Sequence, residues 1–330
     1  MMFPIALNKK ILCLGIANAD TYAKSIDKIP KWNTLSTFDE IKFSPGGCAI
    51  NTAINLTSLG LKTGVSAAIG NDMNGKYIIQ ELKKRKINTE NIFVKNKSTA
   101  STFAMLSSKG KRRYLVHWGA NDLFTAKDIK INLIKNYSLI HFCGTFVMKQ
   151  FDGKETLELA KKIKKNKILI SIDTVFNNKV NCLKLIKNIF PYIDIFFPSI
   201  EELNLITGYN NIKKNIDFLK STKIPFCGVK LGREGSIFIY KNEAFYCSPF
   251  KVKVSDTSGA GDAFMGGLIY SILKKKSLNE IMIFATACAA LNIKYLGASG
   301  NLPNSAYINN FINLELNTSY KINHFIRNIN

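Results

Sequence analysis

Apolar residues occur in two kinds of pattern along the chain, and the order of these patterns predicts an alternation of strands and helices. Short continuous apolar runs, which are typical of buried strands, occur at residues 10–16, 63–69, 139–143, 167–172, 193–197, 225–230 and 236–240. Apolar positions at helical spacing occur at residues 48–59, 75–86, 153–165, 260–273 and 278–295. Because such alternation is typical of a mostly parallel sheet with helices on both faces, the pattern predicts an α/β fold.

Two segments interrupt this alternation. At residues 18–45 and 93–118 apolar and polar positions alternate with a period of two, and the segments contain no helical pattern. We expect them to form a small sheet, a lid subdomain, over the carboxyl edge of the central sheet, where open α/β sheets bind their ligands. The pattern therefore predicts one domain over residues 1–330, and we assign no role to the Asn- and Ile-rich tail at 308–330.

The composition excludes several classes of protein. Apolar residues make up 46% of the chain and the mean hydropathy is +0.02, and no apolar run is long enough to span a membrane. The N-terminus places its lysines after a short apolar piece, which argues against a secretory signal, so we expect a cytoplasmic protein with no membrane partner. Seven cysteines without CxxC spacing, and only three histidines, argue against a disulfide framework and a zinc site.

The net charge of +23 raises the question of nucleic-acid binding. The lysines, however, gather in short runs after amphipathic helical segments, as at 83–86, 161–167 and 274–276, and no basic stripe with interleaved aromatic residues accompanies them. We interpret them as solvated helix faces and expect no nucleic-acid partner. A surface of this charge would still attract an anionic substrate such as ATP.

The most informative motif is the glycine turn at residues 259–261. The small residues Gly259, Ala260 and Gly261 let the backbone approach a ligand closely, and the apolar run that follows predicts a helix. Unpaired N–H groups and the positive end of the helix dipole make such a turn an anion site. Asp262 lies at the same point, where it could take a proton from a hydroxyl that attacks a phosphoryl group. The alternative is a helix N-cap.

A second glycine motif lies near the front of the chain. It is Pro45-Gly-Gly-Cys-Ala-Ile-Asn-Thr-Ala, in which Gly46 and Gly47 allow close backbone approach to a ligand. Asn51, one helical turn later, can both donate and accept hydrogen bonds. Alone, the motif could also be an ordinary turn between a strand and a helix.

Together, in this order and at this separation, the two motifs resemble the signatures of the PfkB-type carbohydrate kinases, the ribokinase-like family. The resemblance covers residues 10–304. It implies a ribokinase-like three-layer α/β/α (Rossmann-like) domain with a small β-sheet lid. It also implies an ATP-dependent kinase, aided by Mg²⁺, that phosphorylates a hydroxyl of a sugar or sugar-like small molecule.

The resemblance assigns roles to individual residues. Asp262 matches the general base, and Gly259, Ala260 and Gly261 match the anion hole that stabilises the transferred phosphoryl group. Asn18 and Asp20, two residues apart, match a pair that grips substrate hydroxyls, although loop capping is an alternative for them. The other residues that match substrate contacts are Gly46, Gly47, Asn51 and Asn121. A plain turn at 121–122 would explain the last of these equally well.

The nucleotide side is assigned in the same way. The residues that match nucleotide contacts are Lys230, Gly232, Gly235, Ser199 and Thr286, although the turn at 232–235 could be a plain hairpin. Ser199 replaces the asparagine that the family often carries there, and Glu202 matches an acidic residue that acts on Mg²⁺ through water. Asp256 and Ser258 match a loop that binds a monovalent cation such as K⁺ in some members. Asp173 ends a strand and could face the site.

Three questions stay open at this point. A nucleoside kinase of the same fold is the nearest alternative, since Phe103, Tyr114 and Trp118 in the lid could contact a base. A noncatalytic sugar- or nucleotide-binding regulator is a more distant one, which should have lost the base at 262. The resemblance also implies a possible homodimer through the lid.

Overall fold

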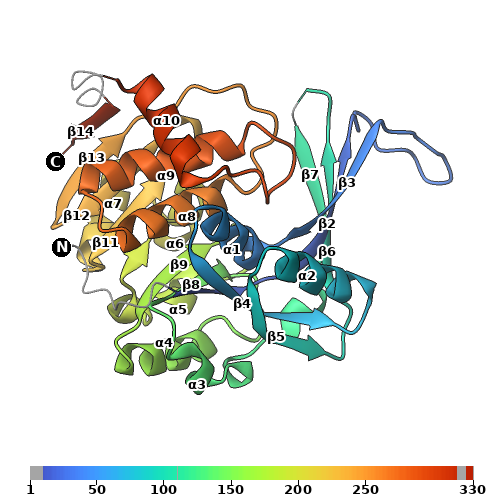
Figure 1. The fold of residues 1–330 in the computed structure, drawn as a ribbon, viewed down its shortest axis with the longest axis horizontal. Helices are drawn as coiled ribbons and strands as arrows, with labels where there is room; N and C mark the ends of the chain where they lie inside the picture. The colour runs from blue at the N-terminus through green and yellow to red at the C-terminus, as the bar shows by residue number, and fades with distance from the viewer. Residues whose placement is uncertain (1–9, 110, 318–324, 330) are drawn as a thin grey trace.

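A ten-stranded sheet runs through the centre of the molecule. The computed structural model describes residues 10–109, 111–317 and 325–329, and the sheet has the strand order β14-β13-β12-β11-β10-β9-β8-β1-β4-β5 (Figure 1). Its strands are β1 (Lys10–Gly15), β4 (Lys62–Gly70), β5 (Asn88–Lys95), β8 (Leu139–Thr145), β9 (Leu169–Thr174), β10 (Ile195–Phe196), β11 (Phe226–Lys230), β12 (Ser236–Tyr240), β13 (Glu243–Cys247) and β14 (Ile326–Asn328). The seven strands from β5 to β11 are parallel to their neighbours, and β12 to β14 pair antiparallel.

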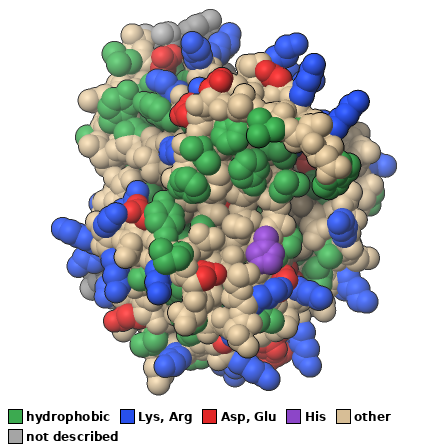
Figure 2. Space-filling view, turned by 90° about the vertical axis from the view of Figure 1, so that its right-hand side faces the viewer, with side chains coloured by type: hydrophobic (Ala, Val, Ile, Leu, Met, Phe, Trp, Pro, Cys, Tyr) green, Lys and Arg blue, Asp and Glu red, His purple; other side chains and the backbone are tan. Residues whose placement is uncertain are grey.

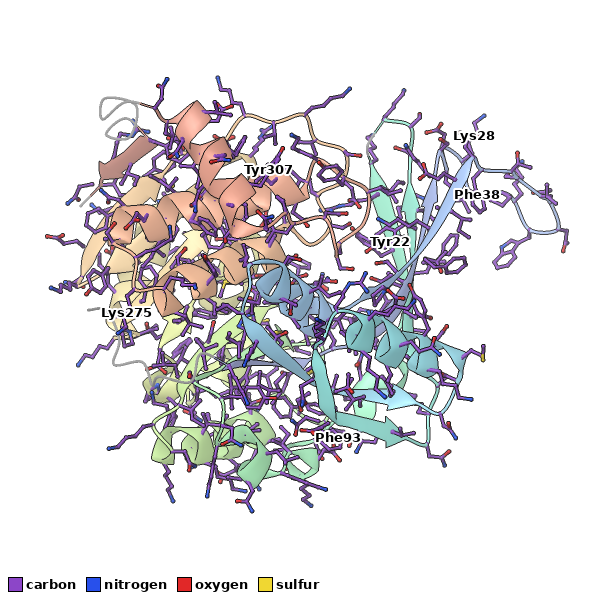
Figure 3. The ribbon with its side chains drawn as sticks, viewed as in Figure 1. Tyr22, Lys28, Phe38, Phe93, Lys275 and Tyr307 are labelled. Carbon is purple, nitrogen blue, oxygen red and sulfur yellow. The ribbon has the colours of Figure 1, made fainter. Side chains whose placement is uncertain are left out.

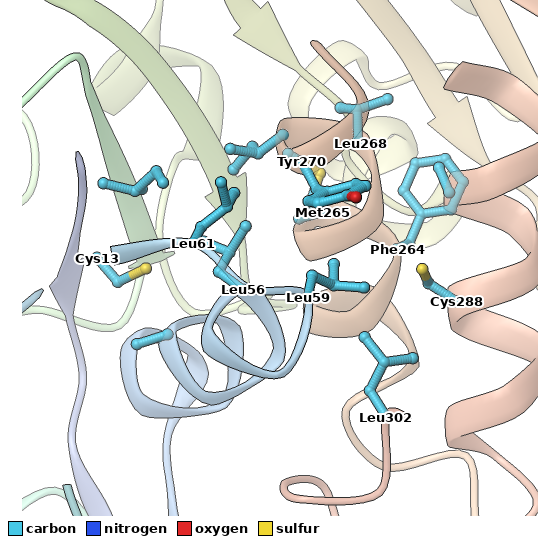
Figure 4. Packing of buried hydrophobic residues seen from close by; sticks show 14 of the residues in the cluster. Cys13, Leu56, Leu59, Leu61, Phe264, Met265, Leu268, Tyr270, Cys288 and Leu302 are labelled. Atoms are coloured by element: carbon cyan, nitrogen blue, oxygen red, sulfur yellow. The ribbon is translucent and has the colours of Figure 1, made fainter. Parts of the chain in front are cut away.

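Helices cover both faces of this sheet, and alternate side chains of the strands supply the two cores. Ile11 and Cys13 of β1 pack into one apolar cluster, and Leu12 and Leu14 pack into the other. The helices are α1 (Cys48–Ser58), α2 (Met73–Lys84), α3 (Ile131–Ile134), α4 (Lys154–Lys165), α5 (Cys182–Ile186), α6 (Ile200–Thr207), α7 (Ile212–Ser221), α8 (Ala260–Leu273), α9 (Leu278–Asn292) and α10 (Ser305–Glu315). Figure 4 shows α1, α8 and α9 packed in the first cluster.

The second sheet is the lid, which stands beside the main body in Figure 1. It has the order β3-β2-β6-β7, formed by β2 (Asn18–Lys24), β3 (Glu40–Gly46), β6 (Ala100–Leu106) and β7 (Arg112–His117). The lid begins later in its second segment than the predicted residue 93, because Asn88–Lys95 pairs with β4 as the edge strand of the large sheet. Apolar and polar positions alternate along its strands because the two faces differ: polar side chains such as Asp20 and Lys42 face the body, whereas apolar side chains such as Phe43 lie on the exposed outer face.

The lid is fastened to the body by side chains on its inner face. The Lys42 ammonium donates to the Leu296 carbonyl at 2.7 Å, and the Tyr22 hydroxyl accepts from the Ala298 N–H at 3.2 Å. The hydroxyls of Tyr114 and Ser258 lie 3.0 Å apart. Figure 3 labels Tyr22 at this junction. These bonds hold the four-stranded sheet close to the loop that precedes α8 and to the loop that follows α9.

The predicted elements of the main domain are present, with boundary shifts of a few residues. Helix α9 ends at Asn292 rather than 295, and β10 is only two residues long. The sequence pattern missed α6 and α7, whose apolar faces are short. Within residues 308–330, to which the sequence assigned no role, α10 extends to Glu315 and β14 pairs with β13. In the described residues no helix has the length and apolar character needed to cross a membrane.

Candidate active site

The carboxyl ends of the parallel strands bring the predicted site residues to one edge of the sheet. Asn18 follows β1, which lies between β4 and β8, where the chain switches from one side of the sheet to the other. Asp173 lies near the end of β9, and Lys230 ends β11. Glu202 lies in the first turn of α6, just after β10. Such an edge is the usual ligand site of an open α/β sheet.

The glycine turn starts helix α8 in the way that the sequence predicts. Gly259 is the N-cap residue, with φ +71°, in the left-handed region that favours glycine. A Cβ atom at this position would overlap the Ala298 carbonyl oxygen. The backbone is therefore held close to the 298 loop. The Ala260 N–H donates to the Thr257 carbonyl at 3.3 Å, which leaves the N–H groups of Gly261 and Asp262 in the first helical turn for an anion.

Asp262 does not cap the helix. Its Oδ2 atom accepts a hydrogen bond from the Asn51 amide at 2.7 Å, and the nearby Cys48 thiol lowers the pKa of the same carboxyl. The side chain is buried, and this burial, together with the nearby Asp173 carboxylate, raises the pKa of Asp262 to about 7. A carboxyl with a pKa near neutrality suits a general base.

The start of β2 forms a second polar cluster at the junction of lid and body. The Asn18 amide donates to the Thr102 hydroxyl at 3.1 Å, and its carbonyl accepts from the Asn121 amide at 2.9 Å. Asn121 also accepts the Ala17 N–H at 3.1 Å. The structure therefore places Asn121 behind Asn18, where it fixes the orientation of the Asn18 amide.

Asp20 lies on the same strand and faces the body. Its Oδ2 atom accepts from the Tyr22 hydroxyl at 3.3 Å, whereas Oδ1 is buried without a partner. Burial raises the pKa of Asp20 to about 6. A side chain at Gly46 would overlap the Asp20 carboxylate, which explains the first glycine of the front motif. The Asn51 Oδ1 atom is also buried without a partner. Unpartnered buried oxygens of this kind are suited to accept bonds from a ligand.

Lys230, Asp173 and Glu202 form a charged cluster beside the glycine turn. The Lys230 ammonium lies 2.7 Å from Asp173 Oδ1, and both side chains are nearly buried. Glu202 Oε2 accepts from the Thr174 hydroxyl and from the Ser199 N–H, each at 2.8 Å. Burial and Asp173 raise the pKa of Glu202, although Lys230 lowers it.

The remaining predicted nucleotide residues have structural partners of their own. Ser199 is the N-cap of α6 and forms a capping box with Glu202. Gly232 and Gly235 form the turn between β11 and β12, with φ values of +59° and +88°. The Thr286 hydroxyl is buried and donates to the Met282 carbonyl within α9.

The two residues assigned to a cation loop lie under the lid. Asp256 Oδ1 accepts from the N–H and the hydroxyl of Ser258 at 2.9 and 2.8 Å, and Oδ2 accepts from the Gly297 N–H at 3.0 Å. A guanidinium nitrogen of Arg112, on lid strand β7, lies 3.8 Å from Oδ1. Both oxygens of Asp256 are therefore used by the protein in this arrangement.

Sequence reasoning missed three residues that complete the site. Cys48 contacts Asp262, Thr102 contacts Asn18, and Tyr22 joins Asp20 to the 298 loop. Of the three, only Tyr22 could have been placed at the site from the sequence. Residues two apart in an alternating strand lie on one face, so Tyr22 lies on the same face as Asp20. The other two contacts join segments that are far apart in the sequence.

The fold and this edge define the ribokinase class, in which a three-layer α/β/α domain carries a β-sheet lid. A profile of the pfkB family carbohydrate kinases matches residues 8–305, so the chain belongs to the PfkB family. It is accordingly a carbohydrate kinase, a phosphotransferase with an alcohol group as acceptor.

Individual relatives agree with this assignment. The chain is 27% identical to a ribokinase of Dictyostelium discoideum over 92% of its own length and 100% of the relative's. It is 27% identical to fructokinase-2 of Solanum lycopersicum over 85% of this chain and 91% of that one. The structure of Arabidopsis thaliana ribokinase complexed with ribose and ATP superposes with a TM-score of 0.77 at 23% identity, covering 93% of this chain and 99% of that one. The expected fold class is thereby confirmed.

Proposed function

We propose that the protein transfers the γ-phosphoryl group of ATP to a hydroxyl of a sugar, with Asp262 as the general base. Asp262 takes the hydroxyl proton while the hydroxyl oxygen forms its bond to the γ-phosphorus. The bond from that phosphorus to the bridging oxygen breaks, and its electron pair leaves with ADP. The observation that carries this proposal is the buried Asp262 carboxylate at the N-terminus of α8, held by Asn51 rather than used as a cap.

The acceptor is bound, in this proposal, by the polar cluster at the start of β2. Asn18 and Asp20 would grip two neighbouring hydroxyls, and the unpartnered oxygens of Asp20 and Asn51 would accept their protons in hydrogen bonds. Gly46 and Gly47 leave room for the sugar ring to approach the backbone. Such a site recognises a vicinal diol and requires no aromatic contact.

A sugar is favoured over a nucleoside by what lines the lid. Phe103 pairs with Thr21 and Leu115 and belongs to the outer face of the lid, away from the body. Tyr114 is on the inner face, but its hydroxyl meets Ser258. A noncatalytic regulator is disfavoured because Asp262 and the glycine turn are both intact.

The charged cluster fits Mg²⁺ bound together with ATP. In the described part of the chain no three acidic, cysteine or histidine side chains converge as a metal cage. Mg²⁺ in kinase sites is usually held by one or two carboxylates, water and the phosphates, so Glu202 would hold it through water. When bound, the ion would neutralise charge on the phosphates. ATP is supplied in the cytoplasm, and we propose that the protein works there.

A direct test compares acceptors. Purified protein with ATP and Mg²⁺ is incubated with single sugars, among them ribose and fructose, and in parallel with nucleosides, and ADP release is measured. We expect ADP release that depends on a sugar and at least tenfold slower release with any nucleoside. Faster ADP release with a nucleoside than with any sugar would show that the substrate is a nucleoside.

The raised pKa of Asp262 predicts the pH dependence of the reaction. Because the base must be deprotonated and its pKa is about 7, kcat/KM for the sugar should fall about tenfold per pH unit below pH 7 and level off above it. Initial rates between pH 5.5 and 9 measure this profile. A profile that stays flat down to pH 5.5 would contradict Asp262 as the base.

We also propose a homodimer through the outer face of the lid. Ile41, Phe43 and Leu115 are 50%, 66% and 64% exposed, and the strand register aligns Phe43 with Thr21, Phe103 and Leu115 in one row. Figure 2, which faces this side, shows hydrophobic side chains gathered together with Lys and Arg side chains around them. An exposed apolar sheet face of this kind is typical of an interface, and a second copy offers an identical face.

The dimer is tested by a charge on this face. Phe43→Glu should shift the protein from dimer to monomer in sedimentation velocity, because an ionised carboxylate would have to be buried in the interface. Met73→Glu, at a 79% exposed position on α2, is the matched control and should leave the dimer intact. A wild-type protein that sediments as a monomer at micromolar concentration would contradict the proposal.

A further inference from the structure

Lys230 occupies an unusual electrostatic position. Its ammonium is 2.7 Å from Asp173 and would lie only 3.2 Å from a Cβ atom on Gly261, the last glycine of the turn that starts α8. The positive end of a helix dipole repels a cation, so this is an unfavourable place for a lysine. The absence of a side chain at Gly261 leaves the ammonium next to the backbone of the proposed anion hole.

Three carboxyl groups act electrostatically on this one ammonium. Asp173 contacts it, and Glu202 and Asp262 interact with it electrostatically. Burial lowers the pKa of Lys230, but the attraction of Asp173 and Glu202 outweighs it, so the net pKa is raised and the lysine stays charged. One cation among three acidic groups leaves a surplus of negative charge. The cluster is therefore arranged for further positive charge to arrive, as it does when a metal–nucleotide complex binds.

We infer that Lys230 is a catalytic residue that contacts the phosphoryl group during its transfer, and that Asp173 is the positioning residue that holds the Lys230 ammonium in place. This inference rests on the proposed function. As the oxygen of the acceptor bonds to phosphorus and the bond to ADP breaks, negative charge spreads over the equatorial phosphoryl oxygens. The ammonium and the N–H groups of the turn would face this charge together, and Lys230 would add a full positive charge to the partial charge of the helix.

The Asp173 tether gives the lysine a fixed starting point. A flexible four-carbon side chain has many rotamers, and holding it in one of them before the substrate arrives removes that entropy cost from the reaction. Asp173 lies near the end of β9 and Lys230 ends β11, with β10 between them, so the pair spans the edge at which ATP is expected. Their spacing is therefore set by the rigid sheet rather than by loops.

The test is Lys230→Met with a matched control. We expect kcat to fall about 10²- to 10³-fold, the usual loss for one electrostatic donor to the transition state, with KM for the sugar changed less than threefold. Lys230 lowers the pKa of Asp262, so the acid limb of the kcat/KM profile should also move to higher pH. Lys164→Met breaks a comparable pair with Asp194, 2.8 Å long, at the opposite edge of the sheet and should leave kcat unchanged.

A double variant separates catalysis from folding. Lys230→Met leaves Asp173 buried without its partner, whereas Lys230→Met combined with Asp173→Asn removes both charges. If the pair is only structural, the double variant recovers kcat; if Lys230 is catalytic, the loss of kcat persists in a folded protein. Recovery, or an unshifted acid limb in the single variant, overturns the inference. Wild-type protein that phosphorylates no acceptor would instead contradict the proposed function.

Discussion

Asp262→Asn is expected to lower kcat by about 10² to 10⁴, the range typical of a lost general base. Asparagine has nearly the same shape and can still bond to the Asn51 side chain after that amide turns over. Sugar and ATP affinity should therefore change little, and the loss should appear in kcat rather than KM. Steady-state rates at pH 8, where the wild-type carboxylate is ionised, measure the effect.

Asp194→Asn serves as its control. Asp194 is also buried, but it accepts the Ile170 N–H and pairs with Lys164 at the other edge of the sheet. It should lower stability and leave kcat near the wild-type value. A kcat for Asp262→Asn within threefold of wild type would remove Asp262 from the proposed mechanism.

Gly259→Ala is expected to disable both the turn and the fold around it. A residue other than glycine in the left-handed region costs about 1–2 kcal/mol, and overlap of the new methyl group with the Ala298 carbonyl adds about 1–3 kcal/mol. Relief of the overlap would move the first N–H groups of α8 away from the phosphoryl group. The free energy of unfolding, measured in urea, and kcat should therefore both decrease.

Gly208→Ala is the control that measures the cost of the left-handed backbone conformation alone. Gly208 ends α6 with φ +75°, and a Cβ atom there would meet nothing within 4 Å. Gly208→Ala should lower the free energy of unfolding only by the conformational cost of a positive φ at a residue other than glycine, and kcat should stay unchanged. Equal losses of unfolding free energy in the two variants would show that the contact with Ala298 is unimportant.

The sequence was sufficient for the elements and motifs that are local in the chain. The glycine turn and Asp262 lie within four residues, and their position before an apolar run predicts a helix N-terminus without knowledge of the rest. Even so, residues 259–262 alone could not separate a cap from a base. That distinction depends on Asn51, 211 residues away, which takes the carboxylate out of the capping role.

What the sequence could not predict depends on long-range register and pairing. Lys230 and Asp173 meet because β9 and β11 lie on either side of β10, an order that periodicity does not reveal. The strand at Asn88–Lys95 alternates as the lid does, and only its pairing with β4 assigns it to the large sheet. The contact between Tyr22 and Ala298 spans 276 residues. Each of these pairings is decided by tertiary packing rather than by local pattern.

The most direct test of the central claim follows the γ-phosphoryl group itself. Wild-type protein and Asp262→Asn are incubated with ATP labelled with ³²P at the γ position, Mg²⁺ and the best acceptor from the sugar panel, and the sugar phosphate is separated and counted. We predict label in the sugar phosphate with wild-type protein and a rate about 10²- to 10⁴-fold lower with Asp262→Asn. Label that goes only to inorganic phosphate, or equal transfer by both proteins, would contradict the account.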